Sequence, residues 1–265
     1  MEWREGGGTR WLEARLSGAV AAFSTRVGGV SEPPFDGLNL GLFTEDERDR
    51  VVENRRRLAS ALGHEPERVA IGRQVHGADL ARHAEPQQPS PFAEPGSRIP
   101  EVDGHVTAER DLALLAFVAD CVPIALAGPA GIAMLHCGWR GLATSCDRAS
   151  GARAEEGAAS GLVDRGVAAV AATDAAIGPS IGPCCYEVGD EVRDAFAGIE
   201  AGVVSGSRLD LAEIARYLLR RAGVERIESS GLCTSCEADL FFSHRRDAGR
   251  TGRQAGLVWR DERKV

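Results

Sequence analysis

The sequence has almost no lysine. Its 31 basic side chains are thirty arginines and one lysine, Lys264, which stands next to the last residue. Schiff-base catalysis, the anchoring of pyridoxal phosphate and the phosphate contact of a P-loop all need a lysine inside the fold, so these chemistries are excluded. An anion site in this protein must therefore use arginine side chains or backbone amides.

Other absences narrow the class of protein further. Acidic side chains outnumber basic ones by 39 to 31, which gives a net charge of −8, and no basic run interleaved with aromatic residues occurs. Nucleic acid is therefore not expected as a partner. No stretch of eighteen apolar residues is present, and the first sixteen residues lack the apolar segment of a signal peptide. We expect a cytoplasmic protein with no membrane contact.

The composition is that of a globular protein, with 43% hydrophobic and only 5% aromatic residues, so its cores should consist of Ala, Val and Leu. Segments typical of strands and helices alternate along the whole chain, which predicts one domain over 1–265 of the α+β class. A strand is predicted over 19–27 and an amphipathic helix over 46–62. The proline-rich segment 84–101 predicts a mobile surface loop.

The middle of the chain contains two apolar runs, 103–127 and 132–136, separated by a Gly-Pro turn. They predict neighbouring buried strands with polar residues at their ends, and Asp120, Cys121 and His136 lie at these ends. The segment 141–170 predicts an interrupted helix, a second helix begins at about 189, and a third covers 209–223. The final segment, 227–260, predicts a strand, a loop and a strand.

Three short runs place a metal-binding side chain beside polar or turn-forming residues: RQVHG at 73–77, ADCVP at 119–123 and HCGWRG at 136–141. Together His76, Cys121 and His136 make the His₂Cys donor set that zinc prefers, with a fourth position open for water or substrate, and an open site implies catalysis. The residues alone also allow a simpler interpretation, in which the two histidines hydrogen-bond at strand ends and Cys121 is a small core residue.

The remaining cysteines show no regular disulfide spacing, and the total of seven is odd, so free thiols are expected. Cys233 and Cys236 have C-x-x-C spacing, but no second such pair exists, and packing or a supporting role near the site is the preferred interpretation. Adjacent cysteines rarely bridge to each other, so Cys184 and Cys185 are interpreted as structural thiols.

An ordered series of motifs resembles the YfiH family, also called the laccase-domain or polyphenol oxidoreductase family. The resemblance runs from about residue 20 to 260 and rests on STRVGGVS (24–31), NLGL (39–42), RQVHG, ADCVP, HCGWRG, IGPSIGPCCYEVG (177–189) and FFSHRRD (241–247) through TGRQAGLVW. It implies a layered α/β/β/α sandwich. It also implies a zinc ion held by His76, Cys121 and His136.

The resemblance further implies a zinc-dependent purine nucleoside phosphorylase that acts on adenosine, inosine and methylthioadenosine, with adenosine deaminase activity at the same metal. Its partners would be a purine nucleoside and phosphate, and a monomer is expected. A four-copper laccase needs about ten imidazoles, and this chain has 6 histidines. Laccase chemistry of that type is therefore excluded by counting.

Roles follow for individual residues if this activity is present. Phosphorolysis needs an anion pocket, for which the candidates are Arg26, Arg140 and Arg245, with Arg26 preferred as the catalytic arginine because it lies beside a Gly-Gly turn. Asp120, next to the catalytic thiolate ligand Cys121, could orient a ligand histidine or protonate the departing base. A surface salt bridge is the alternative role for each arginine.

Asn39 of NLGL and Gln74 of RQVHG complete the expected substrate-binding set, and Tyr186 either lines the same pocket or packs in the core. Two positions depart from the family pattern: Cys137 stands where the family usually has alanine, and DGHVT, which contains His105, replaces the usual DALVT. Both residues add donors near the expected site and could alter the coordination shell.

A second hypothesis uses the same residues in another way. Cys121 could be the nucleophile and His136 the base of a hydrolase or amidase that acts on a cell-wall peptide or another amide. Chelator would inactivate the zinc enzyme, whereas alkylation of a thiol of low pKa would inactivate the hydrolase. A polyphenol oxidase, as the family name suggests, and a metabolite binder without turnover are further alternatives.

Overall fold

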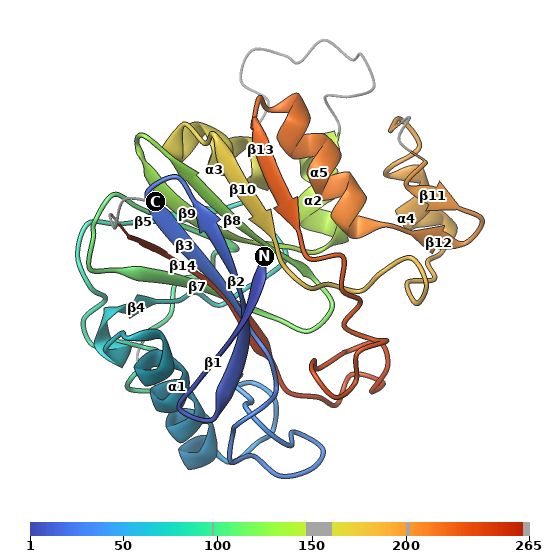
Figure 1. Cartoon of the computed structure of the whole chain (residues 1–265). Helices are drawn as coiled ribbons and strands as arrows, with labels where there is room; N and C mark the ends of the chain where they lie inside the picture. The colour runs from blue at the N-terminus through green and yellow to red at the C-terminus, as the bar shows by residue number, and fades with distance from the viewer. Residues whose placement is uncertain (97, 147–160, 200–201, 262–265) are drawn as a thin grey trace.

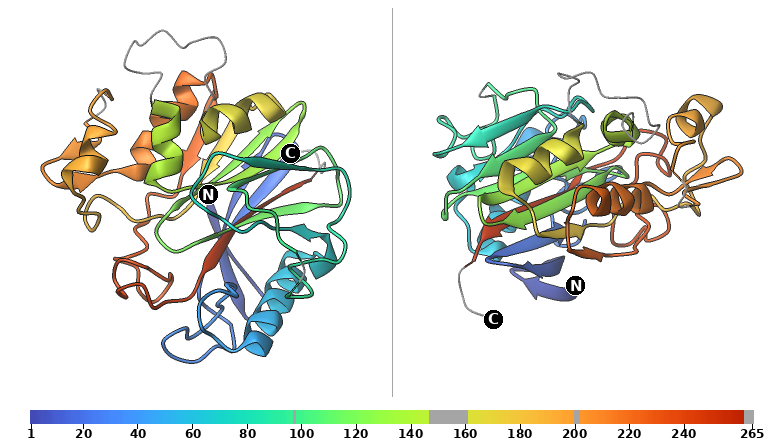
Figure 2. Two further views of the ribbon diagram at one scale, coloured as in Figure 1. Left: turned by 180° about the vertical axis from the view of Figure 1, so that it is seen from behind. Right: turned by 90° about the horizontal axis from the view of Figure 1, so that it is seen from above.

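The computed structural model describes residues 1–96, 98–146, 161–199 and 202–261 (Figure 1). Within these residues two β-sheets pack face to face, and helices cover the outer face of each sheet. Figures 1 and 2 show α1 on one side of the sheets and α2, α3 and α5 gathered on the other. The expected α+β class and the α/β/β/α layering are confirmed.

The first sheet joins the two ends of the chain. Among the described residues it has six strands in the order β1-β2-β3-β14-β7-β4: Glu2–Gly6, Thr9–Leu16, Ala19–Ser24, Gln254–Arg260, Ala113–Val118 and Val69–Ala70. All neighbours are antiparallel except β4 and β7. Because β14 lies between β3 and β7, the sheet cannot be completed until the last part of the chain is in place.

The second sheet, also six-stranded in the described part of the chain, has the order β13-β10-β8-β9-β6-β5: Arg226–Ser229, Asp174–Ile177, Val122–Gly128, Gly131–Cys137, Gly104–Thr107 and Leu80–His83. A small hairpin pairs β11 (Val204–Ser205) with β12 (Arg208–Leu209). The strand pair β8-β9 at the centre of the second sheet carries much of the site described below.

Alternation along the strands explains the layers. In β8, Ile124 and Leu126 face the outer helices, whereas Ala125 and Ala127 face the first sheet. Small side chains recur on the inner faces of both sheets, which brings the sheets close together and produces a core of Ala, Val and Leu with few aromatic residues. The low aromatic content of the sequence therefore has a structural counterpart between the sheets.

The helices agree with the periodicity of the sequence to within a few residues: α1 Arg48–Leu62, α2 Trp139–Cys146, α3 Leu162–Val170, α4 Asp190–Asp194 and α5 Leu211–Arg221, with a 3₁₀ turn at Pro66–Arg68. The side chain of Asp210 accepts a hydrogen bond from the backbone N–H of Glu213 and so caps α5. The predicted interrupted helix over 141–170 corresponds to α2 and α3, and its centre, 147–160, lies outside the described residues. None of the described helices has the length and apolarity needed to cross a lipid bilayer.

Two predictions need correction. The apolar run 103–127 holds three strands rather than one, because β6 and β8 belong to the second sheet and β7 to the first. The segment 84–101 is not wholly a surface loop: Phe92 is fully buried, and Arg55 donates hydrogen bonds to the carbonyls of Pro91 and Phe92. Hydrogen bonding of buried backbone groups therefore anchors part of this segment in the core.

Two buried histidines should make the stability of the fold sensitive to acid. His83 Nε2 lies 3.0 Å from His105 Nδ1, and burial lowers the pKa of His83, while burial and the charge of His83 lower the pKa of His105 to about 3. A histidine of the unfolded chain has a pKa of about 6.5. Below that pH the unfolded state binds protons that the native state does not, so stability falls with falling pH.

We expect the free energy of unfolding to drop by about 2 kcal/mol between pH 7 and pH 5 from His105 alone, measured by urea unfolding at both pH values. In the double variant His83→Gln/His105→Gln, which cannot titrate here, the dependence should be shallower. An equally steep pH dependence in that variant would contradict the assignment.

Candidate active site

The turn between β7 and β8 and the end of β9 form the floor of the site. Cys121 directly precedes β8, and His136 is the penultimate residue of β9, paired with Pro123 of β8. His76 lies in the loop that follows β4. His76 and Asp120 have positive φ values of 61° and 96°, in a region that non-glycine residues rarely adopt, and such strain is concentrated at functional sites.

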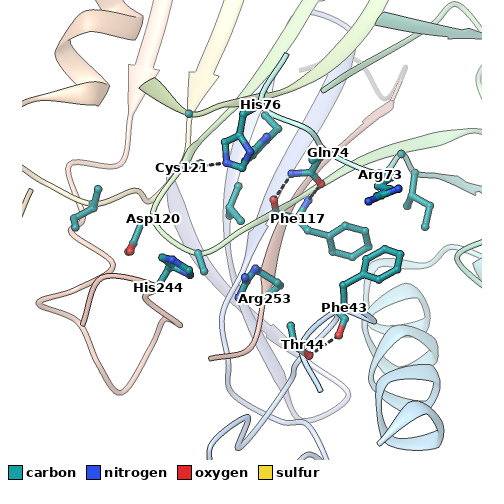
Figure 3. Close-up of a pocket in the computed structure, with 18 of the residues that line it drawn as sticks. Phe43, Thr44, Arg73, Gln74, His76, Phe117, Asp120, Cys121, His244 and Arg253 are labelled. Carbon is teal, nitrogen blue, oxygen red and sulfur yellow. Dashed lines mark hydrogen bonds between the residues drawn. The ribbon is translucent and has the colours of Figure 1, made fainter. Parts of the chain in front are cut away.

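The structure brings the three predicted metal ligands together. His76 Nε2 lies 3.8 Å from Cys121 Sγ (Figure 3), and the donor atoms of His76, Cys121 and His136 all lie within 4.8 Å of one another. The two imidazole rings meet edge to face, with centroids 4.9 Å apart. Two nitrogens and one sulfur at this spacing fit a zinc ion with an open fourth position.

A carboxylate that the sequence analysis missed organises this site. Asp103 Oδ1 accepts a hydrogen bond from His136 Nδ1 at 2.8 Å, which leaves Nε2 of His136 for the metal. The same carboxylate accepts hydrogen bonds from the backbone N–H groups of Val75, His76 and Gly77 at 3.1, 2.9 and 2.7 Å. Asp103 thus orients one ligand and holds the loop that carries another.

The electrostatics favour the ionised thiol. Burial alone would raise the pKa of Cys121, but the charge of His136 and hydrogen bonds from both histidines lower it to about 6. Burial would lower the pKa of His136, yet the charge of Cys121 and the bond to Asp103 raise it to about 9. The thiolate is the form of cysteine that binds metals.

Asp120 lies in the site but contacts other groups than expected. Its carboxylate accepts hydrogen bonds from the hydroxyl of Thr234 at 2.6 Å and from the backbone N–H of Arg245 at 2.7 Å. From the sequence, Asp120 was a candidate to orient a ligand histidine. In the structure Asp103 makes that contact. The acidic residue just before β6, in the run DGHVT, was the available sequence signal.

A cavity of about 620 Å³ opens beside the three donors (Figure 3). This volume is in the range of small-molecule sites. Its walls combine aromatic, amide and cationic side chains, among them Phe43, Thr44, Arg73, Gln74, Phe117, Arg140, Tyr186, His244, Arg245 and Arg253. Metal donors and cationic groups therefore share one cavity.

Three arginines of the cavity differ in how they are held. The Arg140 guanidinium stacks over the Trp139 ring and, within the described residues, makes no hydrogen bond or ion pair with the protein. Arg245 stacks over Tyr186 and donates one hydrogen bond to a backbone carbonyl. Arg253, which the sequence analysis did not single out, donates Nη1 to two carbonyls of its own loop, and its side chain lies centrally in Figure 3.

Arg26 and Asn39 do not line the cavity. The Arg26 guanidinium donates hydrogen bonds to Asp36 Oδ1 at 2.7 Å and to the carbonyl of Ala238 at 3.1 Å. Asn39 is fully buried, and its Oδ1 accepts the backbone N–H of Arg253 at 2.8 Å. These geometries support positions around the cavity rather than contact with a ligand inside it.

Gln74 lines the cavity, but its amide is engaged with the backbone of Phe117, donating Nε2 at 2.6 Å and accepting at Oε1 at 2.9 Å. The two unusual donors noted in the sequence do not join the metal group. Cys137 is fully buried among the outer helices, and His105 is paired with His83.

Fold and site together define a class of protein: an α/β/β/α sandwich with a His₂Cys site at the ends of its central strands. Residues 20–261 match the family model described as multi-copper polyphenol oxidoreductase laccase. The chain belongs to this family, which includes the proteins named YfiH and YlmD.

Several relatives carry a functional name. Purine nucleoside phosphorylase YlmD of Geobacillus stearothermophilus is 39% identical over 93% of this chain and 92% of its own length. Purine nucleoside phosphorylase SCO2081 of Streptomyces coelicolor is 39% identical over 93% and 97%. The crystal structure of Bacillus licheniformis hypothetical protein YfiH superposes with a TM-score of 0.82 at 31% identity, covering 98% of this chain and 99% of that one.

The role of Asp103 can be tested through metal affinity. In Asp103→Asn the side-chain amide must point N–H donors at backbone N–H groups or at His136, so ligand orientation is lost, and zinc affinity should fall about 10- to 100-fold. Competition with a chelating dye measures this. Asp79→Asn, an exposed residue beside the same loop, is the matched control and should bind zinc like the wild type. Unchanged affinity in Asp103→Asn would remove the proposed role.

Proposed function

We propose that the protein is a zinc-dependent purine nucleoside phosphorylase that cleaves adenosine, inosine and methylthioadenosine with phosphate and also deaminates adenosine. The observation that carries the proposal is a single cavity that combines His₂Cys donors, aromatic rings and arginines. Relatives of 39% identity bear the name purine nucleoside phosphorylase, which supports an enzyme of this general kind.

The phosphate would bind the arginines of the cavity. A dianion needs charged donors, and the described chain contains no lysine. Of the five arginines that line the cavity, Arg73 is paired with Glu101 and Arg55 is buried in the core, which leaves Arg140, Arg245 and Arg253 as the candidates. Arg26 was preferred from the sequence, but its guanidinium is engaged with Asp36 and Ala238 outside the cavity. We therefore assign the phosphate contact to the cavity arginines and a positioning role to Arg26.

The purine and ribose would occupy the wall formed by Phe43 and Phe117. Phe43 is 76% exposed, which is unusual for so large an apolar side chain. This exposure supports stacking of the ring against an aromatic ligand. Gln74 fixes the backbone of Phe117 and so keeps this wall in place. The Asp120 carboxylate holds the backbone of Arg245 against the cavity.

His76, Cys121 and His136 would hold the zinc ion, which when bound supplies a Lewis acid and a water of lowered pKa beside the substrate. Asp103 keeps the His136 ring in the orientation and tautomer that leave Nε2 for the metal. Of the other histidines, His83 and His105 pair with each other, His64 packs against Trp259, and His244 lines the cavity without joining the three donors. This distribution supports one mononuclear site and not a four-copper centre.

One observation favours the alternative hydrolase. Cys121, His136 and Asp103 form a chain of thiol, imidazole and carboxylate, in which the carboxylate orients the base, as in a nucleophilic triad. A second imidazole, that of His76, lies 3.8 Å from the same thiol. A triad needs only one imidazole, whereas a metal site uses both, so the zinc enzyme is the better account.

Arginine substitutions test the phosphate site. Arg253→Ala removes a charge-assisted contact to phosphate. It should raise the activation free energy of phosphorolysis by about 2–4 kcal/mol, which lowers the rate roughly thirty- to a thousand-fold. Ribose 1-phosphate formation from inosine measures it. Ammonia release from adenosine without phosphate should fall much less. The control Arg68→Ala changes an exposed arginine outside the cavity and should match the wild type; equal losses in both reactions of Arg253→Ala would refute a phosphate role.

Metal removal separates the two candidate functions. Chelator and Cys121→Ala should each abolish phosphorolysis and deamination, and added zinc should restore the chelated wild type but not the variant. Amide hydrolysis that survives complete zinc removal, yet is lost on alkylation of Cys121, would establish the hydrolase instead.

A further inference from the structure

A second group of metal-binding side chains lies outside the cavity. Cys184 and Cys185 follow β10, Cys233 and Cys236 follow β13, and the four sulfur atoms all lie within 4.8 Å of one another. From the sequence alone, Cys184 and Cys185 are interpreted as structural thiols, and packing or a supporting role is preferred for Cys233 and Cys236. The parallel pairing of β10 and β13 brings the two segments together.

The sulfur positions suit a tetrahedral ion better than a disulfide. The Sγ atoms of Cys184 and Cys185 each lie 3.5 Å from Cys236 Sγ. Four thiolates at about 2.3 Å from a zinc ion occupy the corners of a tetrahedron with edges of about 3.8 Å. One sulfur at equal distances from two others is the arrangement that a shared central ion produces, whereas a disulfide would select one partner.

The backbone around the cluster also favours thiolates. The N–H of Gly182 donates a hydrogen bond to Cys233 Sγ at 3.2 Å, and such a bond stabilises the charged form of the sulfur. A side chain at position 182 would press on the sulfurs, since its Cβ would lie 3.3 Å from Cys184 Sγ. The chain therefore passes closely over the cluster with a donor pointed at it.

Positive charge accompanies both cysteine-bearing loops. Arg208 donates a hydrogen bond to the carbonyl of Pro183, and Arg246 donates hydrogen bonds to the carbonyls of Thr234 and Ser235. A divalent ion with four thiolates carries a net charge of −2. Arg246 also pairs with the carboxylate of Asp247, so Arg208 is the guanidinium that would offset part of this charge.

We propose that Cys184, Cys185, Cys233 and Cys236 bind a second zinc ion in a structural tetrathiolate site. Binding converts four thiols into thiolates and releases their protons to solvent, without any change of oxidation state. All four ligand positions are filled by protein, so this ion has no place for substrate and acts by fastening the two loops. The proposal does not rest on the proposed catalysis, whose metal ligands are His76, Cys121 and His136.

Metal content after removal of loosely bound ions gives the first test. The wild type should contain two zinc ions per chain, and both Cys121→Ala and the double variant Cys233→Ser/Cys236→Ser should contain one. Cys146→Ser is the matched control, because its thiol lies outside both groups and donates to the Leu142 carbonyl as a hydroxyl can, and it should contain two. A double variant that keeps the zinc content of the wild type would overturn the proposal.

Cobalt substitution provides a second test that needs no change in the cluster. In Cys121→Ala the catalytic site retains two imidazoles and no thiolate, so any thiolate-to-cobalt charge-transfer absorption must come from the cysteine cluster. We expect that absorption, together with the d–d bands of tetrahedral cobalt. Their absence in the folded variant would overturn the proposal.

The mass of the denatured, unreduced wild type completes the experiment. It should correspond to seven free thiols, and a loss of two hydrogen atoms per bridge would show disulfides in place of a metal site. An iron–sulfur absorption spectrum in the purified protein would likewise overturn the assignment of zinc.

Discussion

The site depends on the carboxylate of Asp103. It lies just before β6 and is almost completely buried. It accepts four hydrogen bonds, one from the His136 ring and three from successive backbone N–H groups of the His76 loop. Burial raises the pKa of Asp103, but these donors outweigh it and the net pKa is lowered. A buried charge is tolerated when it is fully hydrogen-bonded, and removing its partners would be strongly destabilising. The position of both imidazoles is therefore coupled to the stability of the fold.

The two-sheet architecture explains why ligands distant in sequence meet. His136 lies at the end of β9, and Cys121 lies in the turn that crosses between the sheets, so strand pairing places both. His76 lies in a loop, and no strand pairing fixes its position relative to the other two. Only His76 needs an external anchor, which Asp103 provides. His76 and Asp120 have positive φ angles, which indicate strained backbone. The bonds to Asp103 hold the first in place, and the bonds of the Asp120 carboxylate to Thr234 and Arg245 hold the second.

Much of the fold could be predicted from the sequence, because periodicity in α5 and the apolar runs of β8 and β9 report burial directly. The three metal ligands could be proposed from motif resemblance. Asp103 was missed: its place in the run DGHVT was the available signal, but the bonds to backbone groups that define its role have no sequence signature. Arg26 and Arg253 illustrate the same limit: both stand beside glycines or small residues, and only tertiary contacts show that Asp36 engages the first while the second lines the cavity.

Because lysine is so scarce, the cationic groups of the cavity are arginines, whose donors have a fixed geometry. A guanidinium has five donors in a fixed plane, and a carbonyl that takes one or two of them leaves the others directed elsewhere. Arg253 donates Nη1 to its own loop, and Asn39 fixes its backbone, so the rest of the fork is set in place before any anion arrives. Asp120 does the same for Arg245 through its backbone N–H.

Asp120 also links the two sulfur sites. It is adjacent to Cys121, and its other carboxylate oxygen accepts the hydroxyl of Thr234, which lies between Cys233 and Cys236. An ion that fastens the cysteine loops would thus hold Thr234, and through Asp120 the turn that carries Cys121. The side chains of the site are then already ordered in the folded protein, so substrate binding does not have to supply the free energy of ordering them.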